Sequence, residues 1–328
     1  MRPPLGRAAR RLAAAALTVA LTTFLAYAAL ALLPGDPLAG AVPPELAARL
    51  DAGQRAELAH RLGLDRPLLV RYLDWARRAA RGDLGRSIRT GRPVADDIAG
   101  RIGATVELNL AALALVAAAG LPLGWGAARW RGRAAERLAG GALVALYALP
   151  AFWIAMLAQQ LFAVRLGWLP LYGRTPAGAE AGPAARLAHL VLPAACLALH
   201  GLAFYARFAR DTALEGLASA HALAARALGL PESQVFRRHA VRPSLVPLAT
   251  LAGLLVPSLA TGSVLIETLF AWPGVGRLYV QAVAARDVPV VMALTAIVAL
   301  LTVAGSLLAD LGAAAADPRL RAGGGPGG

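Results

Sequence analysis

The residues that most often perform chemistry in proteins are sparse in this sequence and too far apart to act together. The chain of 328 residues contains one cysteine and five histidines, and only His189 and His200 share an apolar stretch. Eleven residues of helix separate these two by about 16 Å, which is too far for a shared metal ion. Cys196 has no second cysteine to form a disulfide or a cysteine metal site. We therefore expect no catalytic residue, no cofactor and no metal, and a polar contact with a neighbouring helix for each histidine.

Two kinds of energy coupling are also poorly supported by the sequence. A phosphate-binding loop of the form G-x-x-x-x-G-K-[ST] needs a lysine, and all 33 Lys+Arg residues are arginine. An ion-coupled carrier usually places carboxylates inside its membrane spans. Here Glu107 and Asp310 stand near the ends of apolar stretches, where the solvated interface accounts for them.

Ser263 follows a glycine but lacks the G-x-S-x-G pattern and partner base of a hydrolase.

Four uncharged polar residues inside apolar stretches have two explanations. Gln159, Gln160, Thr261 and Ser263 could line a polar path across a membrane, or they could form hydrogen bonds between helices. The sequence leaves both explanations open.

The elements that carry these residues are expected to be apolar helices. The chain is 58% hydrophobic and 16% charged, with a mean hydropathy of +0.58, which is too apolar for an ordinary soluble domain. Residues 12–33 would form about 33 Å of uncharged helix, enough to cross a bilayer core and too long for a cleaved signal peptide. We predict an all-α, polytopic membrane protein with six transmembrane helices. The predicted spans are 12–33, 105–128, 138–164, 187–206, 244–266 and 288–309.

The distribution of arginine predicts how these spans are oriented. With the N-terminus inside, the cytoplasmic segments are the N-terminal tail, 129–137, 207–242 and the C-terminal tail, and they hold 16 arginines against five in the two short outer loops. Because short arginine-rich loops stay in the cytoplasm, both termini are predicted to lie inside. The segment 34–104 is too long for this rule. Arginines that are spread between spans, at a net charge of +14, favour a lipid bilayer and not nucleic acid as the partner.

Local patterns add detail between and within the spans. Residues 45–65 and 67–82 have apolar side chains at helical spacing, so two or three amphipathic helices are predicted at the outer surface. Each proline within a span removes one backbone hydrogen bond and should kink its helix. These prolines are Pro122, Pro150, Pro193, Pro247 and Pro257.

The longest inner loop contains a short helix with well-marked ends. Ser219 is a good N-cap, residues 220–228 are mostly good helix formers, and Gly229 with Pro231 should stop the helix. A helix of about 13 Å is too short to be stable alone in water, so it must pack against its own bundle or a partner. Small side chains at Ala224 and Ala225 would let a partner approach closely.

This helix also carries a recognisable sequence. LAARALG at 223–229 resembles the E-A-A-x-x-x-G segment of the inner-membrane permease subunits of binding-protein-dependent ABC importers, with Leu223 in place of the acid and Leu228 in place of the usual basic residue. Other blocks resemble the dipeptide/oligopeptide/nickel permease branch and follow in the right order over residues 12–321. These blocks are ALLPGDP, LGLDRPLLVRYLDW, GDLGRSIRTGRPV, FAVRLGWLP, LIETLFAWPGVGRLYVQAVAARDVPVV and DPRLR.

The resemblance implies an architecture and a set of partners. It implies a MetI-like permease core at 105–312, after a first transmembrane helix and outer amphipathic segment at 1–104 and before a cytoplasmic tail at 313–328. The implied partners are a second homologous permease subunit, two ABC ATPase subunits and an extracytoplasmic substrate-binding protein. The implied location is the cytoplasmic (inner) membrane, and ATP hydrolysis is assigned to the partner subunits.

The resemblance also implies two sites. The residues expected to couple the chain to the ATPase are Ala224, Ala225, Arg226, Gly229, Leu230, Glu232 and Glu215. Arg207 and Arg210 flank this region and either pair within it or hold the loop inside. In ETLFAWPGVG, Trp272 would lie at the membrane interface as an anchor, or the block would form an outer gate or a docking surface for the delivery protein. The residues of that second site are Glu267, Trp272, Pro273, Gly274 and Gly276.

The cargo expected from this branch is a di- or oligopeptide. One cysteine, three methionines and no histidine cluster offer no ligand set for a naked soft metal ion. A nickel complex or another small solute is the alternative within the branch. The alternatives from other classes are an ion-coupled secondary carrier and a receptor or scaffold that does not transport.

Overall fold

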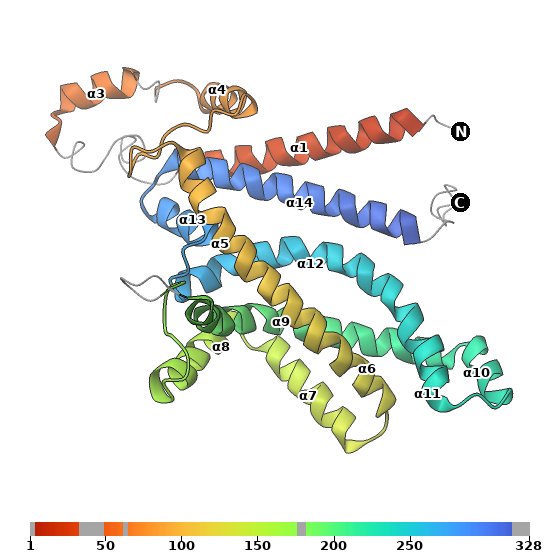
Figure 1. Cartoon of the computed structure of the whole chain (residues 1–328). Helices are drawn as coiled ribbons and strands as arrows, with labels where there is room; N and C mark the ends of the chain where they lie inside the picture. Colours follow the sequence, from red (N-terminus) through yellow and green to blue (C-terminus); the bar gives the residue numbers. More distant parts are fainter. Residues whose placement is uncertain (1–3, 33–48, 62–64, 176–181, 317–328) are drawn as a thin grey trace. The chain divides into compact units, whose positions relative to one another are not determined.

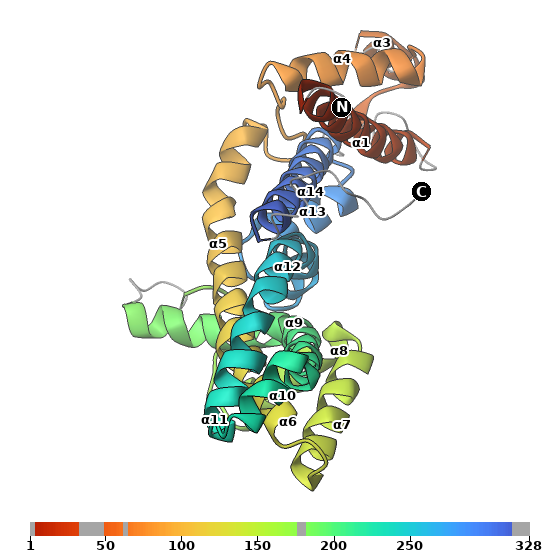
Figure 2. The same cartoon turned by 90° about the vertical axis from the view of Figure 1, so that its right-hand side faces the viewer.

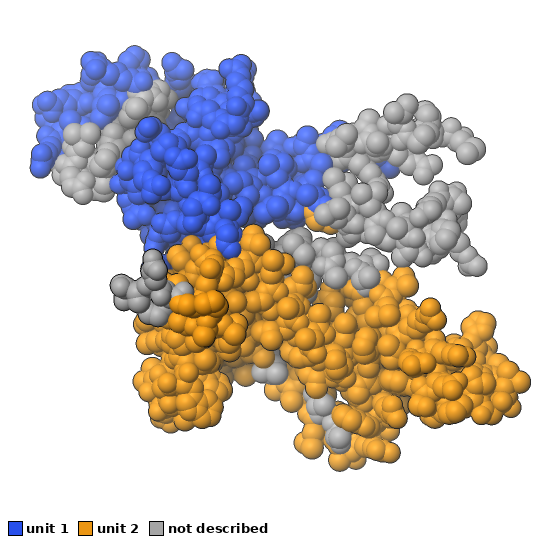
Figure 3. Space-filling view, in the orientation of Figure 1, with its two compact units in different colours: residues 1–103, 274–304 blue, residues 104–273, 305–328 orange. Residues whose placement is uncertain are grey.

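The computed structural model describes residues 4–32, 49–61, 65–175 and 182–316, and these residues are almost entirely helical (Figure 1). The described part contains no β-strand, only an isolated bridge between Arg86 and Pro93. The all-α prediction is confirmed. Two compact units can be distinguished, one of residues 1–103 with 274–304 and one of residues 104–273 with 305–328 (Figure 3). The predicted division at 104 and 312 into an outer segment, a core and a tail stays a prediction.

The first unit consists of a long apolar helix and shorter helices packed on it. Its helices are α1 (Pro4–Ala31), α3 (Ala52–Arg61), α4 (Leu68–Ala80), the beginning of α5 (Val94–Leu115), α13 (Val275–Ala284) and most of α14 (Val288–Ala316). Tyr27 of α1, Tyr72 of α4 and Met292 of α14 form one buried cluster. Helices α3 and α4 confirm the amphipathic helices predicted here, while residues 34–48 and 62–64 lie outside the described residues.

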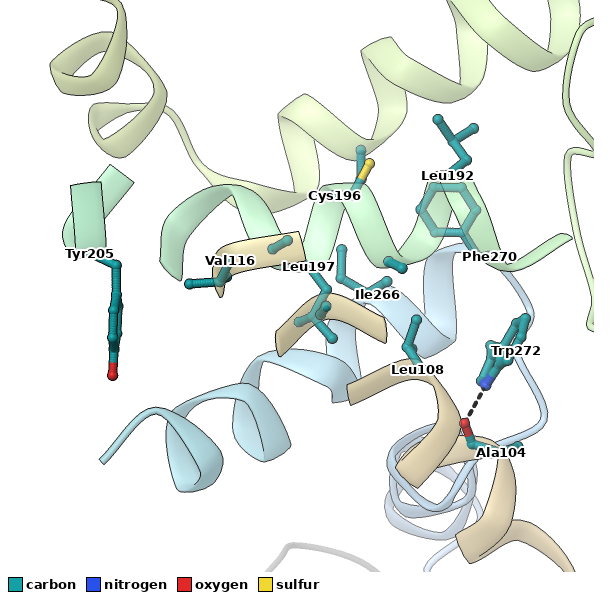
Figure 4. Close-up of a cluster of buried hydrophobic side chains, with 14 of the residues drawn as sticks. Ala104, Leu108, Val116, Leu192, Cys196, Leu197, Tyr205, Ile266, Phe270 and Trp272 are labelled. Carbon is teal, nitrogen blue, oxygen red and sulfur yellow. Dashed lines mark hydrogen bonds between the residues drawn. The ribbon is translucent and has the colours of Figure 1, made fainter. Parts of the chain in front are cut away.

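The second unit is arranged around helix α9. Its helices are the end of α5, α6 (Leu121–Arg129), α7 (Ala134–Ala148), α8 (Ala151–Ala158), α9 (Pro183–Ala218), α10 (Ala220–Ala227), α11 (Glu232–Val235) and α12 (Arg242–Leu269). Helices α6, α7, α8 and α12 all pack against α9. Leu108, Leu197, Ile266 and Trp272 belong to the buried apolar cluster between these helices (Figure 4).

Small residues allow helices α6 and α9 to approach closely. A Cβ atom added to Gly124 would lie 2.2 Å from the carbonyl oxygen of Ala206 and 2.8 Å from the Cβ of Ala209. No side chain fits at that distance, so the packing of α6 on α9 requires glycine at position 124. Close backbone approach through small residues is typical of helix packing in membranes.

Four helices among the described residues are long and apolar enough to cross a membrane. These are Ala13–Ala31, Val94–Arg129, Pro183–Ala218 and Val288–Gly305. The predicted span 138–164 is not one helix, because α7 ends at Ala148 and α8 begins at Ala151, after Pro150. The predicted span 244–266 coincides with α12, which includes residues whose side chains are not described. A total of six spans therefore stays a prediction.

The prolines disturb their helices in different ways. Pro150 separates two helices, whereas Pro193 lies inside the continuous helix α9. Pro122 directly follows a π-helical segment, Val116–Gly120, that joins α5 to α6. Two further π-helical segments are Gln159–Arg165 and Phe236–Val241, and the second of these runs into α12. A π-helical turn inserts one residue into the helix without ending it. Pro193 therefore does not end its helix, and the kinks expected at the prolines stay predictions.

Candidate functional site

The short helix predicted in the longest inner loop is present, with the predicted ends. Helix α10 covers Ala220–Ala227, and its N-cap Ser219 accepts a hydrogen bond from the amide of Ala222 at 3.3 Å. Gly229 has a φ angle of +77°, in the left-handed region that favours glycine. Pro231 then precedes α11 and cannot continue the helix.

One face of α10 packs on its own chain. Ala222 and Ala225 form a buried cluster with Val235 of α11, and Leu217 and Leu230 pack around it. Ala225 is only 7% exposed. Its small side chain therefore allows α11 to pack against α10, and it does not lie on the outer face where a partner would bind.

The rest of the α10 surface is open to solvent and is mostly apolar. Leu223 is 57% exposed, and Leu228, directly after the helix, is 80% exposed; Ala224 and Ala227 also lie on the surface, together with His221. In LAARALG, Leu223 and Leu228 occupy the positions where the resemblance expected an acid and a base. The exposed face of this chain is therefore suited to apolar contact.

An ion pair holds the turn after α10. Arg226 donates to Glu232 through Nε at 3.0 Å and through a terminal nitrogen at 2.7 Å, and it also donates to the carbonyl of Leu217 at 3.1 Å. These hydrogen bonds lower the pKa of Glu232 below its ordinary value and raise the pKa of Arg226. Both residues were expected at the coupling site, and here they connect α9, α10 and α11. Glu215 lies on α9, on the exposed surface.

Two contacts that were not expected position this region. A Cβ atom on Gly216 would lie 2.2 Å from the carbonyl oxygen of His239, so α9 and the π-helical segment Phe236–Val241 touch through their backbones. Arg210 forms an ion pair with Glu136, at the start of α7, and a second one with Asp211 at 2.7 Å. The hydrogen bond from Arg210 lowers the pKa of Glu136. Arg210 thus pairs with the start of α7 and with its neighbour Asp211, and not with Glu215.

The residues predicted at the outer end of α12 are buried. Trp272 and Glu267 are both 0% exposed, and Gly274 and Gly276 are also buried, with Pro273 half-buried. The indole Nε1 of Trp272 donates to the carbonyl of Ala104 at 2.8 Å (Figure 4). Thr105 donates to Glu267 at 2.8 Å. Trp272 is therefore packed against α5 and is not exposed as an anchor or docking side chain would be, while its depth in the membrane stays a prediction.

The end of α12 has an unusual cap. The amide of Trp272 donates to the carbonyl of Glu267 at 2.8 Å, and Ala271 between them has a φ angle of 50°. This is the hydrogen-bond pattern of a Schellman motif, in which glycine normally takes the left-handed position. The cap turns the chain so that the Trp272 ring enters the core.

Glu107 lies in the interior of α5 and binds two arginines. It accepts hydrogen bonds from Arg174 at 2.9 Å and from Arg186 at 3.0 Å. The prediction that solvation at a span end accounts for Glu107 is therefore wrong, because this carboxylate has specific partners. Their effect is to tie α5 to the connection before α9 and to the first turn of α9.

The polar residues of the apolar stretches mostly bind backbone groups. Gln159 is buried and donates to the carbonyls of Leu171 and Leu269, at 3.3 and 3.2 Å, as the hydrogen-bonding explanation expected. The Nδ1 atom of His189 lies 3.1 Å from the carbonyl of Tyr172, which belongs to a connection and not to a helix. The ring of His200 lies 5.5 Å from that of Tyr147 at a tilt of 40°, and its buried Nδ1 atom has no hydrogen-bond partner in the described structure. The polar contact expected for His200 is thus replaced by a ring contact.

Gln160 and the remaining polar residues do not distinguish a polar path from hydrogen bonds between helices. Gln160 is exposed, whereas Ser263 is buried. Thr261 and Asp310 are among the residues whose side chains are not described. The described residues contain no group of three or more His, Cys, Asp or Glu side chains that could hold a metal ion.

The helices and their apolar composition define a polytopic helical membrane protein. The chain belongs to the family described as "Binding-protein-dependent transport system inner membrane component", which it matches over residues 120–322. It is therefore a permease subunit of the inner membrane and not an enzyme, and its family works with ATPase and substrate-binding partners. An ion-coupled carrier and a receptor that does not transport are excluded by this membership.

Individual relatives cover nearly the whole chain. The chain is 34% identical over 302 residues to the oligopeptide transport system permease protein AppB of Bacillus subtilis, covering 91% of this chain and 93% of that one. It is 36% identical over 331 residues to the di/tripeptide transport system permease protein DppB of Pseudomonas aeruginosa, covering 95% and 98%. It is 34% identical over 310 residues to the glutathione transport system permease protein GsiC of Escherichia coli O6:H1, covering 93% and 95%.

A solved structure supports the fold. The chain resembles a chain of the MetNI methionine ABC transporter in its inward-facing conformations with a TM-score of 0.50 and 18% sequence identity. The similarity covers 66% of this chain and 95% of the other. The MetI-like permease fold is therefore confirmed.

Proposed function

We propose that this chain forms part of the translocation path of an ABC importer for di- and oligopeptides. The observation that carries the proposal is the similarity, along more than nine-tenths of both chains, to permease proteins named for oligopeptide and di/tripeptide transport. A relative named for glutathione transport also carries a peptide. Nickel complexes remain the second candidate from the same branch.

Uptake by the reconstituted complex tests the cargo. The chain should be placed in vesicles with its partner permease, its ATPases and its binding protein. Di- or oligopeptides should be taken up only when ATP is present on the ATPase side, and excess unlabelled peptide should compete. Uptake of a nickel complex that excess peptide leaves unchanged, together with no peptide uptake, would overturn the peptide assignment.

The complex is proposed to contain a second, homologous permease subunit and two ATPase subunits, with α10 as the docking helix. Leu223 on α10 and Leu228 directly after it expose apolar side chains, whereas Ala222 and Ala225 are already covered by Val235. A partner groove would cover these leucines and remove their apolar surface from water.

At the other end, the contacts of Glu267 and Trp272 are proposed to close an outer gate. Both side chains are buried, and they bind neighbouring residues of α5: Glu267 binds Thr105, and Trp272 binds the carbonyl of Ala104. An opening movement of α12 away from α5 would have to break both hydrogen bonds. Trp272→Phe, which removes the indole donor and part of the buried ring, should therefore favour the open gate and raise ATP hydrolysis in the absence of cargo. If that basal rate stays at the wild-type value, the contact does not close a gate.

The proposed topology places residues 40–100 and 270–285 outside, and 129–137 and 211–242 in the cytoplasm, with both termini inside. The arginine distribution supports it. On a Cys196→Ser background, Ala134→Cys should resist an impermeant thiol reagent in intact cells, whereas Arg89→Cys should react. Labelling of position 134 in intact cells would refute this orientation.

A further inference from the structure

Helix α4 has an exposed apolar edge that no other described element covers. Leu69 is 55% exposed and Leu73 is 41% exposed, and Ala80 is also on the surface. Positions 69, 73 and 80 are four and seven residues apart, so they share one edge of the helix. The other long face of the helix is occupied, because Tyr72 is buried between Phe24, Tyr27 and Trp75.

The same helix is strongly basic. Residues 66–81 contain five arginines against one aspartate. Successive residues of a helix are 100° apart, so Arg77 and Arg81 come next to the apolar edge, while Arg78 lies farther round. Long arginine side chains beside an apolar edge can keep their charge in water or at phosphate groups while their stems cover apolar surface. A basic amphipathic helix of this kind is typical of a membrane surface.

The contact with α1 sets the depth of α4. The hydroxyl of Tyr72 lies 2.9 Å from Thr23 Oγ1 and donates to the carbonyl of Ala20 at 2.8 Å. The apolar stretch of α1 that could cross a membrane ends at Ala31. Ala20, Thr23 and Tyr27 precede that end by eleven, eight and four residues, or about 17, 12 and 6 Å along the helix. Interfacial helices insert by about 5–10 Å into the boundary between headgroups and acyl chains, so the contact with Tyr27 lies within this range, and the Tyr72 hydroxyl reaches deeper.

The direction of α4 fits the same position. Figures 1 and 2 show that α4 runs across α1 and not along it. If α1 crosses the bilayer, a helix that runs across its end lies in the plane of the membrane surface.

We propose that α4 is an interfacial helix, with its edge of Leu69, Leu73 and Ala80 among lipid acyl chains and with Arg77 and Arg81 at anionic phospholipid headgroups. The depth and direction of α4, its apolar edge and its positive charge all fit contact with a lipid surface. A protein partner such as the delivery protein would account for the exposed leucines but not for the depth at which Tyr72 holds the helix. The assignment to the outer leaflet rests on the proposed topology, which the label at position 134 tests separately.

Accessibility of labelled side chains in the reconstituted complex tests this proposal. On the Cys196→Ser background, nitroxide labels at Leu73→Cys and at its neighbour Asp74→Cys would be compared in vesicles of phosphatidylcholine and phosphatidylglycerol in equal amounts. The label at position 73 should collide preferentially with lipid-soluble oxygen, and the label at 74 with a water-soluble nickel chelate. The ratio of the two collision rates should differ several-fold between the positions, with or without the binding protein.

The other outcomes overturn the proposal. Equal access of the chelate to both labels would place the helix in water. A label at 73 that is shielded from both reagents would indicate a covering protein, and shielding that needs the binding protein would make this edge a docking surface for that protein.

The arginines are tested by a matched pair of variants. A basic side chain near an anionic surface strengthens attachment by about fivefold. The double variant Arg77→Gln/Arg81→Gln should therefore raise the access of the nickel chelate to the label at 73 in vesicles that contain phosphatidylglycerol. It should not do so in vesicles of phosphatidylcholine alone. Arg78→Gln, which lies farther from the lipid edge, should change little. An identical response in both kinds of vesicle would remove anionic headgroups from the proposal.

Discussion

Replacing Leu228 with serine should separate docking of the ATPase from folding of the permease. The Leu228 side chain is 80% exposed, directly after the last residue of α10 and next to Gly229, and it does not belong to the buried cluster of Ala222, Ala225 and Val235. Surface substitutions away from packed positions usually change the free energy of unfolding by less than about 0.5 kcal/mol. The subunit should therefore insert and unfold like the wild type.

The effect on the complex should be much larger. Complete burial of a leucine side chain is worth about 1.5–3 kcal/mol, so a contact that covers most of Leu228 contributes about 1–2 kcal/mol. Its loss should weaken binding of the ATPase by roughly five- to thirty-fold. Leu223→Ser should act in the same direction, but more weakly, because less of that side chain is available to a partner.

The assay is ATPase binding to the purified permease, together with uptake and cargo-stimulated ATP hydrolysis. Leu166→Ser, in the predicted outer connection, is the control for loss of an exposed leucine. Ala225→Glu should differ from Leu228→Ser in its effect on the permease itself. A carboxylate forced against Val235 should lower the thermal stability of the permease, which Leu228→Ser should leave unchanged. Wild-type binding and uptake by a well-expressed Leu228→Ser variant would refute the docking role of α10.

Three further substitutions test the local geometry. Ala271→Gly should raise the stability of the subunit by up to about 1–2 kcal/mol, because glycine takes the left-handed position without a steric penalty; an unchanged or lower unfolding midpoint would contradict the strained cap. Gly229→Val should lower stability by about 1 kcal/mol or more for the opposite reason, and should disturb cargo-stimulated ATP hydrolysis at normal expression. Asp287→Ala should lower the stability of the subunit by about 1–3 kcal/mol, seen as a lower unfolding midpoint. The reason is that the buried carboxylate accepts hydrogen bonds from Ser87 Oγ at 2.5 Å and from the amide of Ile88 at 3.1 Å. Protease resistance should be lost first in the segment that contains Ser87 and Ile88.

Local signals in the sequence predicted α10 well. Its cap, its left-handed glycine and its proline are determined by residues within about one turn of each helix end, so Ser219 and Gly229 have the expected roles. The orientation of the helix was not predictable in the same way. Ala224 and Ala225 are identical neighbours in the sequence, and only the position of Val235, after the turn, decides that Ala225 is the buried one.

Long-range contacts account for the expectations that differ from the structure. Trp272 follows an apolar run and precedes a Pro-Gly turn, a pattern typical of an interfacial tryptophan, yet its indole binds Ala104, which is 168 residues away. Glu107 looked like a residue at a span end because its partners are distant in sequence, Arg174 in the connection before α9 and Arg186 in the first turn of α9. Gly124 and Gly216 carry no motif, and their importance lies in the carbonyl groups of other helices that occupy the space of a side chain.

The uninterrupted course of α9 has a mechanical consequence. Arg186, in its first turn, is held by Glu107 of α5, and Ser219, directly after its last residue, begins α10. About 50 Å of a single helix separates these two points. No loop lies between them to take up a displacement, so a force applied at α10 would reach the arginine pair as a tilt of the whole rod. A tilt of only about 6° over that length would displace the far end by about 5 Å, comparable to the 5.4 Å pitch of a helical turn. Stiffness of α9 alone would then couple these two points, without any relay of side-chain rearrangements.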